Sequence, residues 1–278
     1  MAYENFIPRV WSKTIERELE RLFVFAVDCN RKYEGDVKKQ GDSVRILGVG
    51  KPTITKTNDK NIKLTDAENI DDTSVTMPIK KIAYFNYKVG DIDKAQSAPN
   101  GLMDALSMET SEGLSDVMDT DIAALAATGA AKKLFDSASQ VTAENVLQIM
   151  DKALETLYGK DVKPQSKIVF TVSPRFYTLF KQAYIKADTN NSEILKNGMV
   201  AKYGNAIVRM SNNVAKSTDG TTDFIMCRTD RAVAFCNPMT HVEPYRPEKG
   251  FEDAVKGFVL YDCMIVRPKE LCVLNVKY

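Results

Sequence analysis

The sequence predicts an α+β fold, and three regions carry this prediction. Residues 42–90 alternate in polarity and are rich in β-branched side chains, which is typical of a long two-stranded hairpin. Residues 99–128 carry one apolar stripe at helical spacing and predict the longest helix of the chain. After residue 141, short strand-like runs follow amphipathic helices. No repeat or low-complexity tract interrupts this order.

The predicted hairpin is notable for its length. Its return strand covers about 73–89, and roughly sixteen residues at about 3.3 Å each would reach about 50 Å. A compact domain of 278 residues has a radius of gyration of only about 19 Å. Because an isolated two-stranded ribbon is marginally stable in water, we expect this arm to lie on a neighbouring molecule. The hairpin therefore predicts assembly.

Shorter elements follow from periodicity and capping residues. An amphipathic helix is predicted over 9–27, where apolar residues recur at spacings of three and four. A second helix is predicted from an N-cap at Thr142 to Gly159, and a third begins at Pro174 after Ser173. The predicted strands are 168–172, 206–210, 224–227, 232–236, 258–266 and 271–276.

The long helix is acidic. It carries six acids and no base, namely Asp104, Glu109, Glu112, Asp116, Asp119 and Asp121. The segment 31–63 carries nine basic residues against four acidic ones. Charge pairing between these two segments is one interpretation, and an ordinary solvated acidic face is the other.

Composition excludes several classes of function. The chain has 38 basic and 37 acidic residues, so its overall charge attracts neither nucleic acid nor an anionic membrane. No apolar run approaches the ~20 residues of a membrane span, and the start lacks a signal peptide, which predicts cytoplasmic synthesis. The five cysteines show no Cys-x-x-Cys pair, so we expect buried thiols rather than a zinc site.

No motif predicts catalysis. His241 is the single histidine, and no Gly-x-Ser-x-Gly elbow is present. Residues 48–51 lack the spacing of a phosphate-binding loop. The pairs Asp91/Asp93 and Asp119/Asp121 have no further ligands near them in the sequence. We therefore predict no catalytic, cofactor or metal site, and a protein that is not an enzyme.

The order of the elements resembles the major capsid (coat) proteins of tailed bacteriophages, whose fold is shared with encapsulin compartments and the herpesvirus capsid floor. Residues 6–12 (Phe-Ile-Pro-Arg-Val-Trp-Ser) resemble their N-terminal arm. Residues 30–35 (Asn-Arg-Lys-Tyr-Glu-Gly) with 41–46 resemble the start of their extended loop. Residues 203–211 resemble a strand of their axial domain, and 242–249 leading into 256–268 resemble their closing segment. The resemblance covers essentially the whole chain.

The resemblance implies a division of the chain. It gives an N-terminal arm (1–35), an extended β-hairpin loop (36–90), a peripheral domain with a long spine helix (91–140 and 241–278) and an axial α/β domain (141–240). It also implies pentamers and hexamers that form an icosahedral shell around the double-stranded DNA genome, in the virion, after assembly in the host cytoplasm. The implied partners are further copies, a separate scaffolding protein and a portal at one vertex, with a decoration protein as another candidate. DNA would be held without sequence-specific contacts, and no membrane is implied.

The arm-like string begins within ten residues of Met1, so we expect separate scaffolding and no cleavage of this chain. Lys56 and Lys60 lie near the loop tip, but we expect non-covalent clamping rather than a lysine–asparagine cross-link. The candidate contacts between subunits are Trp11, Arg17, Arg21, Lys38, Lys39, Arg45, Lys56, Lys60, Asp116, Asp119, Arg246 and Glu248.

Three alternatives stay open at this point. The first is an encapsulin-type compartment that encloses an enzyme cargo, which the phage-like string at 6–12 disfavours. The second is an oligomeric surface or tail-tube protein, although tube proteins are nearly all β and about a third of this chain is predicted to be helical. The third is an enzyme of unknown type, which the missing motifs disfavour.

Overall fold

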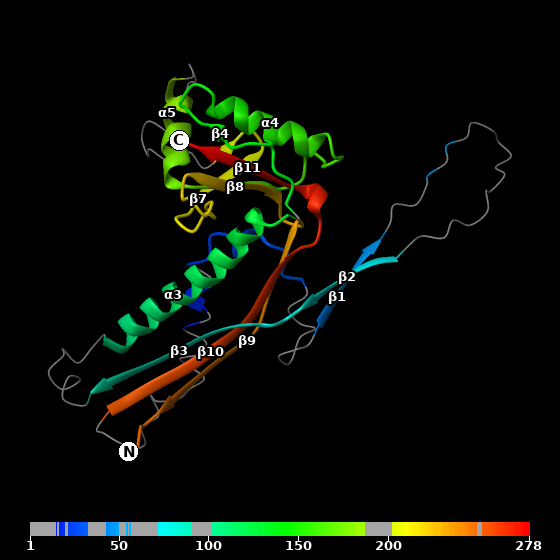
Figure 1. The fold of residues 1–278 in the computed structure, drawn as a ribbon. Coiled ribbons are helices and arrows are strands. Elements are labelled where there is room, and N and C mark those ends of the chain that lie inside the picture. The colour runs from blue at the N-terminus through cyan, green and yellow to red at the C-terminus, as the bar shows by residue number, and fades with distance from the viewer. Residues whose placement is uncertain are drawn as a thin grey trace.

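The fold is a mixed arrangement of helices and three sheets (Figure 1). The computed structural model describes residues 15, 17–19, 22–32, 43–49, 54, 56, 72–90, 102–129, 131–186, 202–248 and 252–278. The strand orders are β1-β2, β3-β10-β9 and β4-β11-β8-β5-β7-β6. The predicted α+β class is confirmed.

The six-stranded sheet forms one end of the molecule. Its strands are β4 (Ser139–Gln140), β5 (Ile168–Val172), β6 (Lys202–Tyr203), β7 (Ala206–Met210), β8 (Thr222–Thr229) and β11 (Leu271–Lys277). β5 pairs parallel with β7 and antiparallel with β8. Every residue of β5 is buried, which is what a continuous apolar run achieves when both faces of a sheet are covered.

Two helices cover this sheet, α4 (Val146–Tyr158) and α5 (Pro174–Lys186). α4 begins later than the predicted cap at Thr142, because the N–H of Thr142 donates to Asn145 Oδ1 (2.8 Å) and holds a turn before the helix. The helix ends at Gly159, as predicted. α5 begins after Ser173, whose Oγ accepts from the N–H of Phe176 (3.4 Å), so the predicted cap is confirmed.

The three-stranded sheet is long and lies beside the longest helix (Figure 1). Its strands are β3 (Lys81–Gly90), β9 (Val233–Tyr245) and β10 (Glu252–Ile265). The helix is α3 (Leu102–Ala124), continued by a 3-10 turn, η3 (Leu125–Ala127), and confirms the predicted helix over 99–128. A Cβ at Gly257 would lie 2.5 Å from Cζ of Phe85, so glycine is required for the ring to cross β10.

A separate two-stranded ribbon consists of β1 (Ser43–Val49) and β2 (Asp72–Pro78). The predicted hairpin is therefore confirmed at its base, but its return strand is divided. β2 ends at Pro78, and β3 pairs with β10 rather than with β1. The paired part is seven residues per strand, about 23 Å long. The rest of the predicted return strand, 81–89, forms β3 in the three-stranded sheet, so the predicted arm of about 50 Å is wrong.

Two further elements need separate description. β11 lies inside the six-stranded sheet, between β4 and β8, and not with the other tail strands. Six of its seven residues are buried, which suits a strand covered on both faces. The helix predicted over 9–27 lies mostly outside the described residues. Residues 15, 17–19 and 22 are helical, residue 23 is not, and η1 (Ala26–Asp28) is a short 3-10 turn.

Candidate assembly surfaces and a buried anchor

Among the residues that the structure describes, one face of the three-stranded sheet is only partly covered. Along β3 the side chains alternate, with one set half-buried on the side of α3 and the other set exposed. The exposed set includes Tyr84, of which 81% is accessible, and Ile82, of which 42% is accessible. The register places Tyr84 opposite Phe258, which is opposite His241 on β9, and these last two rings lie 5.6 Å apart.

Polar side chains surround this apolar centre. Lys256 Nζ lies 3.3 Å from Glu243 Oε2 and 5.1 Å from the ring centroid of Tyr245, whose hydroxyl donates to Asn86 Oδ1 (3.1 Å). An exposed apolar centre with a polar border is the usual anatomy of a protein–protein interface. We call this surface the outer patch and define it as Ile82, Tyr84, Asn86, His241, Lys256 and Phe258.

The other half of the same face is covered by the base of the ribbon. Val44, Ile46, Met77 and Ile79 pack with Leu260 in a small apolar cluster that also contains Ala234 and Cys236. The register places Leu260 directly opposite Ile82. The outer patch is therefore the uncovered continuation of a surface that the chain already uses to bind a ribbon.

The predicted contact residues are spread widely. Trp11, Arg21, Lys38, Lys39 and Lys60 lie outside the described residues. Arg17 is exposed and pairs locally with Glu18 (3.2 Å), while Arg45 and Lys56 are exposed on or beyond β1. Arg246 and Glu248 are exposed just after β9. The described members do not form one cluster, and none belongs to the outer patch.

Asp119 has a different place from the one expected. Its side chain lies inside its own subunit, where only 2% of the residue is exposed. It accepts hydrogen bonds from the backbone N–H groups of Val24 (2.7 Å), Phe25 and Ala26 (both 3.2 Å). Asp119 is therefore not a surface charge, and we drop it from the candidate contacts. Asp116 remains exposed and accepts from Asn213 Nδ2 (2.8 Å).

The basic neighbour of the acidic helix comes from β3. Asp121 Oδ2 lies 3.0 Å from Nζ of Lys81 and accepts from the hydroxyl of Tyr261 (2.6 Å). Burial lowers the pKa of Lys81, but the hydrogen bond and charge of Asp121 outweigh it and hold the pKa above its ordinary value. Burial and Asp121 together raise the pKa of Tyr261. The predicted pairing with 31–63 falls largely on residues outside the described ranges.

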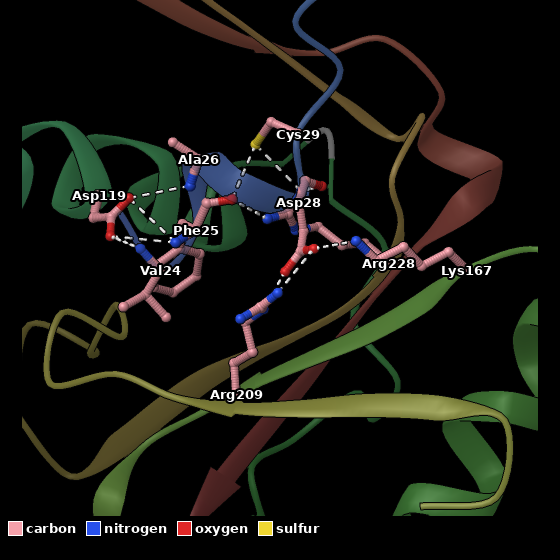
Figure 2. A network of polar contacts seen from close by, with 9 residues as sticks. All are labelled: Val24, Phe25, Ala26, Asp28, Cys29, Asp119, Lys167, Arg209 and Arg228. Atoms are coloured by element: carbon pink, nitrogen blue, oxygen red, sulfur yellow. Dashed lines mark hydrogen bonds and ion pairs between the residues drawn. The ribbon is translucent and has the colours of Figure 1, made fainter. Parts of the chain in front are cut away.

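The N-terminal segment is held by a network of buried polar contacts (Figure 2). Asp119 of α3 binds the N–H groups of residues 24–26. Arg228 of β8 donates to the carbonyl oxygens of Asp28 (2.6 Å) and Phe25 (2.7 Å). The carboxylate of Asp28 pairs with Lys167 Nζ (2.7 Å) and Arg209 Nε (2.5 Å). We call these five side chains and the backbone of residues 24–29 the buried anchor.

The two carboxylates of the anchor differ in their electrostatics. Burial raises the pKa of Asp28, but hydrogen bonds and charges from Lys167 and Arg209 outweigh burial and hold the pKa below its ordinary value. For Asp119, burial is the stronger effect, and the pKa lies above its ordinary value despite the N–H donors and Arg228. Sequence reasoning missed the anchor, because Arg228 directly follows the predicted strand 224–227 and precedes the polar residues 229–231, which is typical of an exposed strand end.

The thiols are buried, as the sequence predicted. All five cysteines lie in the interior and no disulfide joins them. Burial raises the pKa of Cys29, Cys227, Cys263 (to about 12) and Cys272. Within the described ranges, no group of three or more His, Cys, Asp or Glu side chains is arranged to hold a metal ion. None of the described helices is long and apolar enough to cross a membrane.

Comparisons with protein-family models and with curated proteins find no match to this chain. Solved structures do match. A structure of Mycobacterium phage Che8 has a TM-score of 0.74 and 25% sequence identity, and the likeness covers 90% of both chains. The capsid of the cyanophage P-SCSP1u has a TM-score of 0.64 at 15% identity, with 86% of this chain and 84% of that chain covered.

The chain has the major capsid protein fold of tailed bacteriophages. The predicted family resemblance is thus confirmed by structure, and the neighbours are structural proteins of capsids rather than enzymes. A virus-like particle from Pyrococcus furiosus shares the capsid fold as well, with a TM-score of 0.62 at 13% identity over 98% of this chain and 99% of that chain.

Proposed function

We propose that this protein is the subunit of an icosahedral phage head, assembled from pentamers and hexamers around double-stranded DNA. The observation that carries the proposal is the likeness to capsid structures over nearly the whole chain, with 89% of this chain and 87% of the chain from the mature capsid of bacteriophage PhiM1 covered. The near balance of 38 basic and 37 acidic residues fits a wall that encloses DNA without binding it tightly.

The outer patch and the ribbon suggest how neighbouring subunits meet. The outer patch continues the surface that the chain's own ribbon base occupies, and its centre is apolar. Beyond the paired part of the ribbon, Ile54 is 89% exposed. We propose that the outer patch of one subunit receives the ribbon of a second copy, which would bury Tyr84, Ile82 and Ile54 together.

The charged candidates have a secondary role in this proposal. Arg17, Arg45, Lys56, Arg246 and Glu248 are exposed, so each would contact a neighbour at the rim of an interface. Exposed ion pairs contribute only about 0–1 kcal/mol each, so these residues would set orientation more than affinity. A scaffolding protein, a portal at one vertex and a decoration protein remain proposed partners.

Expression of the protein alone tests the proposal. Negative-stain electron microscopy and light scattering of the soluble fraction should show closed particles, or discrete pentamers and hexamers. A chain that stays monomeric, both alone and with a candidate scaffolding protein, would contradict the shell function.

A cargo compartment is the second candidate, favoured by the likeness to the virus-like particle from Pyrococcus furiosus over almost all of both chains. The contents of particles purified from the native source separate the two candidates. A head contains genome-length double-stranded DNA and one portal assembly per particle. A compartment contains a co-purifying enzyme and no genome-length DNA.

A further inference from the structure

We propose that the outer patch binds a second copy only while His241 is neutral, so that protons control the contact between subunits. The inference rests on the function proposed above, in which the ribbon of a second copy covers this patch. It adds the residue through which the pH of the solution would act on that contact. His241 is the single histidine of the chain.

Side chains on the outer face of the three-stranded sheet follow one another in rows across the strands. In the first row Ile82 lies opposite Leu260, which belongs to the cluster that the ribbon base covers. In the second row Tyr84 lies opposite Phe258, and Phe258 lies opposite His241. The rings of His241 and Phe258 are 5.6 Å apart, with 38° between their planes. The imidazole is therefore the member of an aromatic row that can gain a charge near neutral pH.

The charges nearest to His241 already balance one another. On β9, Glu243 Oε2 lies 4.0 Å from His241 Nε2, but Nζ of Lys256 on β10 lies closer to the same oxygen, at 3.3 Å. One row further along the sheet, Nζ of Lys88 on β3 lies 2.9 Å from Glu252 Oε2. A protonated imidazole would therefore be a positive charge in excess of these two ion pairs.

In the isolated subunit, water solvates both forms of the imidazole. The side chain of His241 is 54% exposed, and that of Glu243 is 51% exposed. Charged groups this exposed interact only weakly, because water screens them. Protonation of His241 should therefore leave the folding of the subunit nearly unchanged.

A ribbon that covers the patch removes this water. The proposed contact brings the exposed side chain of Ile54 to the aromatic row, and Arg45 and Lys56 of the ribbon are exposed cations. An imidazolium removed from water without an acid of its own is disfavoured, and cations nearby add to the penalty. A neutral imidazole instead packs as one more ring. The second copy should therefore bind while His241 is neutral and dissociate when it gains a proton.

The sign and size of the pH dependence follow from this linkage. The free subunit binds more protons than the covered one, so assembly weakens as pH falls. An ordinary imidazole is half protonated near pH 6.5, and each pH unit below this value should weaken the contact by about tenfold. Ordinary carboxylates and amines keep their charge between pH 5.5 and 7.5. The single histidine should therefore dominate the pH dependence of assembly in this range.

The experiment removes, fixes or moves the charge of the histidine. His241→Gln is neutral at every pH, and His241→Lys stays charged. The double variant His241→Gln/Gln182→His is the matched control, since it places the histidine at an exposed position of α5 instead. Light scattering and sedimentation velocity measure the critical concentration for particle formation at pH 5.5, 6.5 and 7.5 and constant ionic strength. Thermal melting at each pH reports folding.

For wild type we expect the critical concentration to rise about tenfold from pH 7.5 to 5.5. For His241→Gln and for the double variant it should change by less than about twofold over the same range, whatever its value at pH 7.5. His241→Lys should need at least about tenfold more protein than wild type at pH 7.5, because its charge cannot be removed there.

A wild-type critical concentration that stays constant or falls as pH falls would overturn the inference. A pH dependence that His241→Gln retains would overturn it as well, and so would normal assembly of His241→Lys. If His241→Gln does not fold, His241→Asn is measured in its place. A wild-type protein that forms no particles at any pH contradicts the shell function and the inference with it. Normal wild-type particles whose pH dependence does not follow His241 contradict the inference alone.

Discussion

The six-stranded and three-stranded sheets differ in how completely the chain covers them. In the six-stranded sheet, β5 is buried along its whole length, and six of seven residues of β11 are buried. In the three-stranded sheet, β3 turns one face to α3 and leaves Ile82 and Tyr84 exposed on the other. The difference teaches that the chain buries β5 and most of β11 on both faces but leaves apolar side chains of β3 exposed, where the proposed contact with a second copy would lie. Substitutions in the two sheets should therefore separate folding from assembly.

The largest effect on subunit stability is expected in the core around the six-stranded sheet. Phe176 of α5 is fully buried in the main apolar cluster, and Phe176→Ala should lower the free energy of unfolding by about 3–5 kcal/mol. Urea denaturation followed by circular dichroism measures this change. Gln182→Ala, at an exposed position of the same helix, serves as a control. A loss below about 1 kcal/mol would contradict the view of this sheet as a tightly packed core.

A smaller loss is expected where the three-stranded sheet is closely packed on its covered side. Gly257→Ala would place a Cβ 2.5 Å from Cζ of Phe85 and 2.7 Å from the carbonyl oxygen of His241. We expect a loss of about 1–3 kcal/mol from overpacking. The double variant Gly257→Ala/Phe85→Leu should recover part of the loss in the same denaturation assay, since it removes the ring that the methyl group meets.

The free energy of unfolding should depend on pH through Asp28, whose carboxylate pairs with Lys167 and Arg209. Its folded pKa lies below the ordinary value, so its ionised form contributes stability above the pKa of the unfolded chain, and this contribution is lost as pH falls toward the folded pKa. Asp28→Asn should therefore be less stable than wild type at pH 7 by about 1–3 kcal/mol. The difference in the free energy of unfolding between wild type and Asp28→Asn should become smaller as pH falls below about 4.

The ionisation of Asp119 has the opposite effect on the free energy of unfolding. Its folded pKa is raised, so its ionisation reduces stability as pH rises from the ordinary carboxyl range through the folded value. Urea denaturation at pH 7, 5 and 3.5 measures both residues. A gap between wild type and Asp28→Asn that stays constant across this range would show that the charge of Asp28 has no part in it.

The smallest effect on stability should accompany the largest effect on assembly. Tyr84→Asp changes a side chain that is 81% exposed in the isolated subunit, so the free energy of unfolding should change by less than about 0.5 kcal/mol. In an assembled shell the same carboxylate would be buried without a partner, and particle formation should fail. Tyr84→Phe keeps the ring and should assemble normally. Equal particle yields from Tyr84→Asp and wild type, measured by sedimentation, would show that the outer patch faces solvent in the shell.

Much of the fold could be predicted because local patterns agreed with the final structure. The helix over 99–128 and the strands at 168–172 and 206–210 follow directly from their periodicities. The division of the return strand was missed because the alternation of polarity continues through both β2 and β3. Pro78 was the local signal, since proline cannot donate to a strand ladder and commonly marks a strand end.

The candidate contacts could be predicted less well, because a side chain's surroundings depend on partners distant in the sequence. Asp119 looked like its acidic neighbours, although it stands four residues after Ser115 and three before Ile122, on the buried stripe of α3. Asp28 and Arg209 are 181 positions apart, so no local pattern relates them. Tyr84 was visible as an aromatic residue, but its exposure follows only from the pairing of β3 with β10.

Because all five cysteines are buried, the surface of the subunit exposes no reactive thiol. Their thiols are shielded, and burial raises the pKa of four of them, so reagents that attack thiolates have little to react with while the chain is folded. A single cysteine introduced at Asn86 or Lys88 would be the one accessible thiol of the native subunit. Its labelling rate would then follow the closing of one surface, subunit by subunit, as particles form.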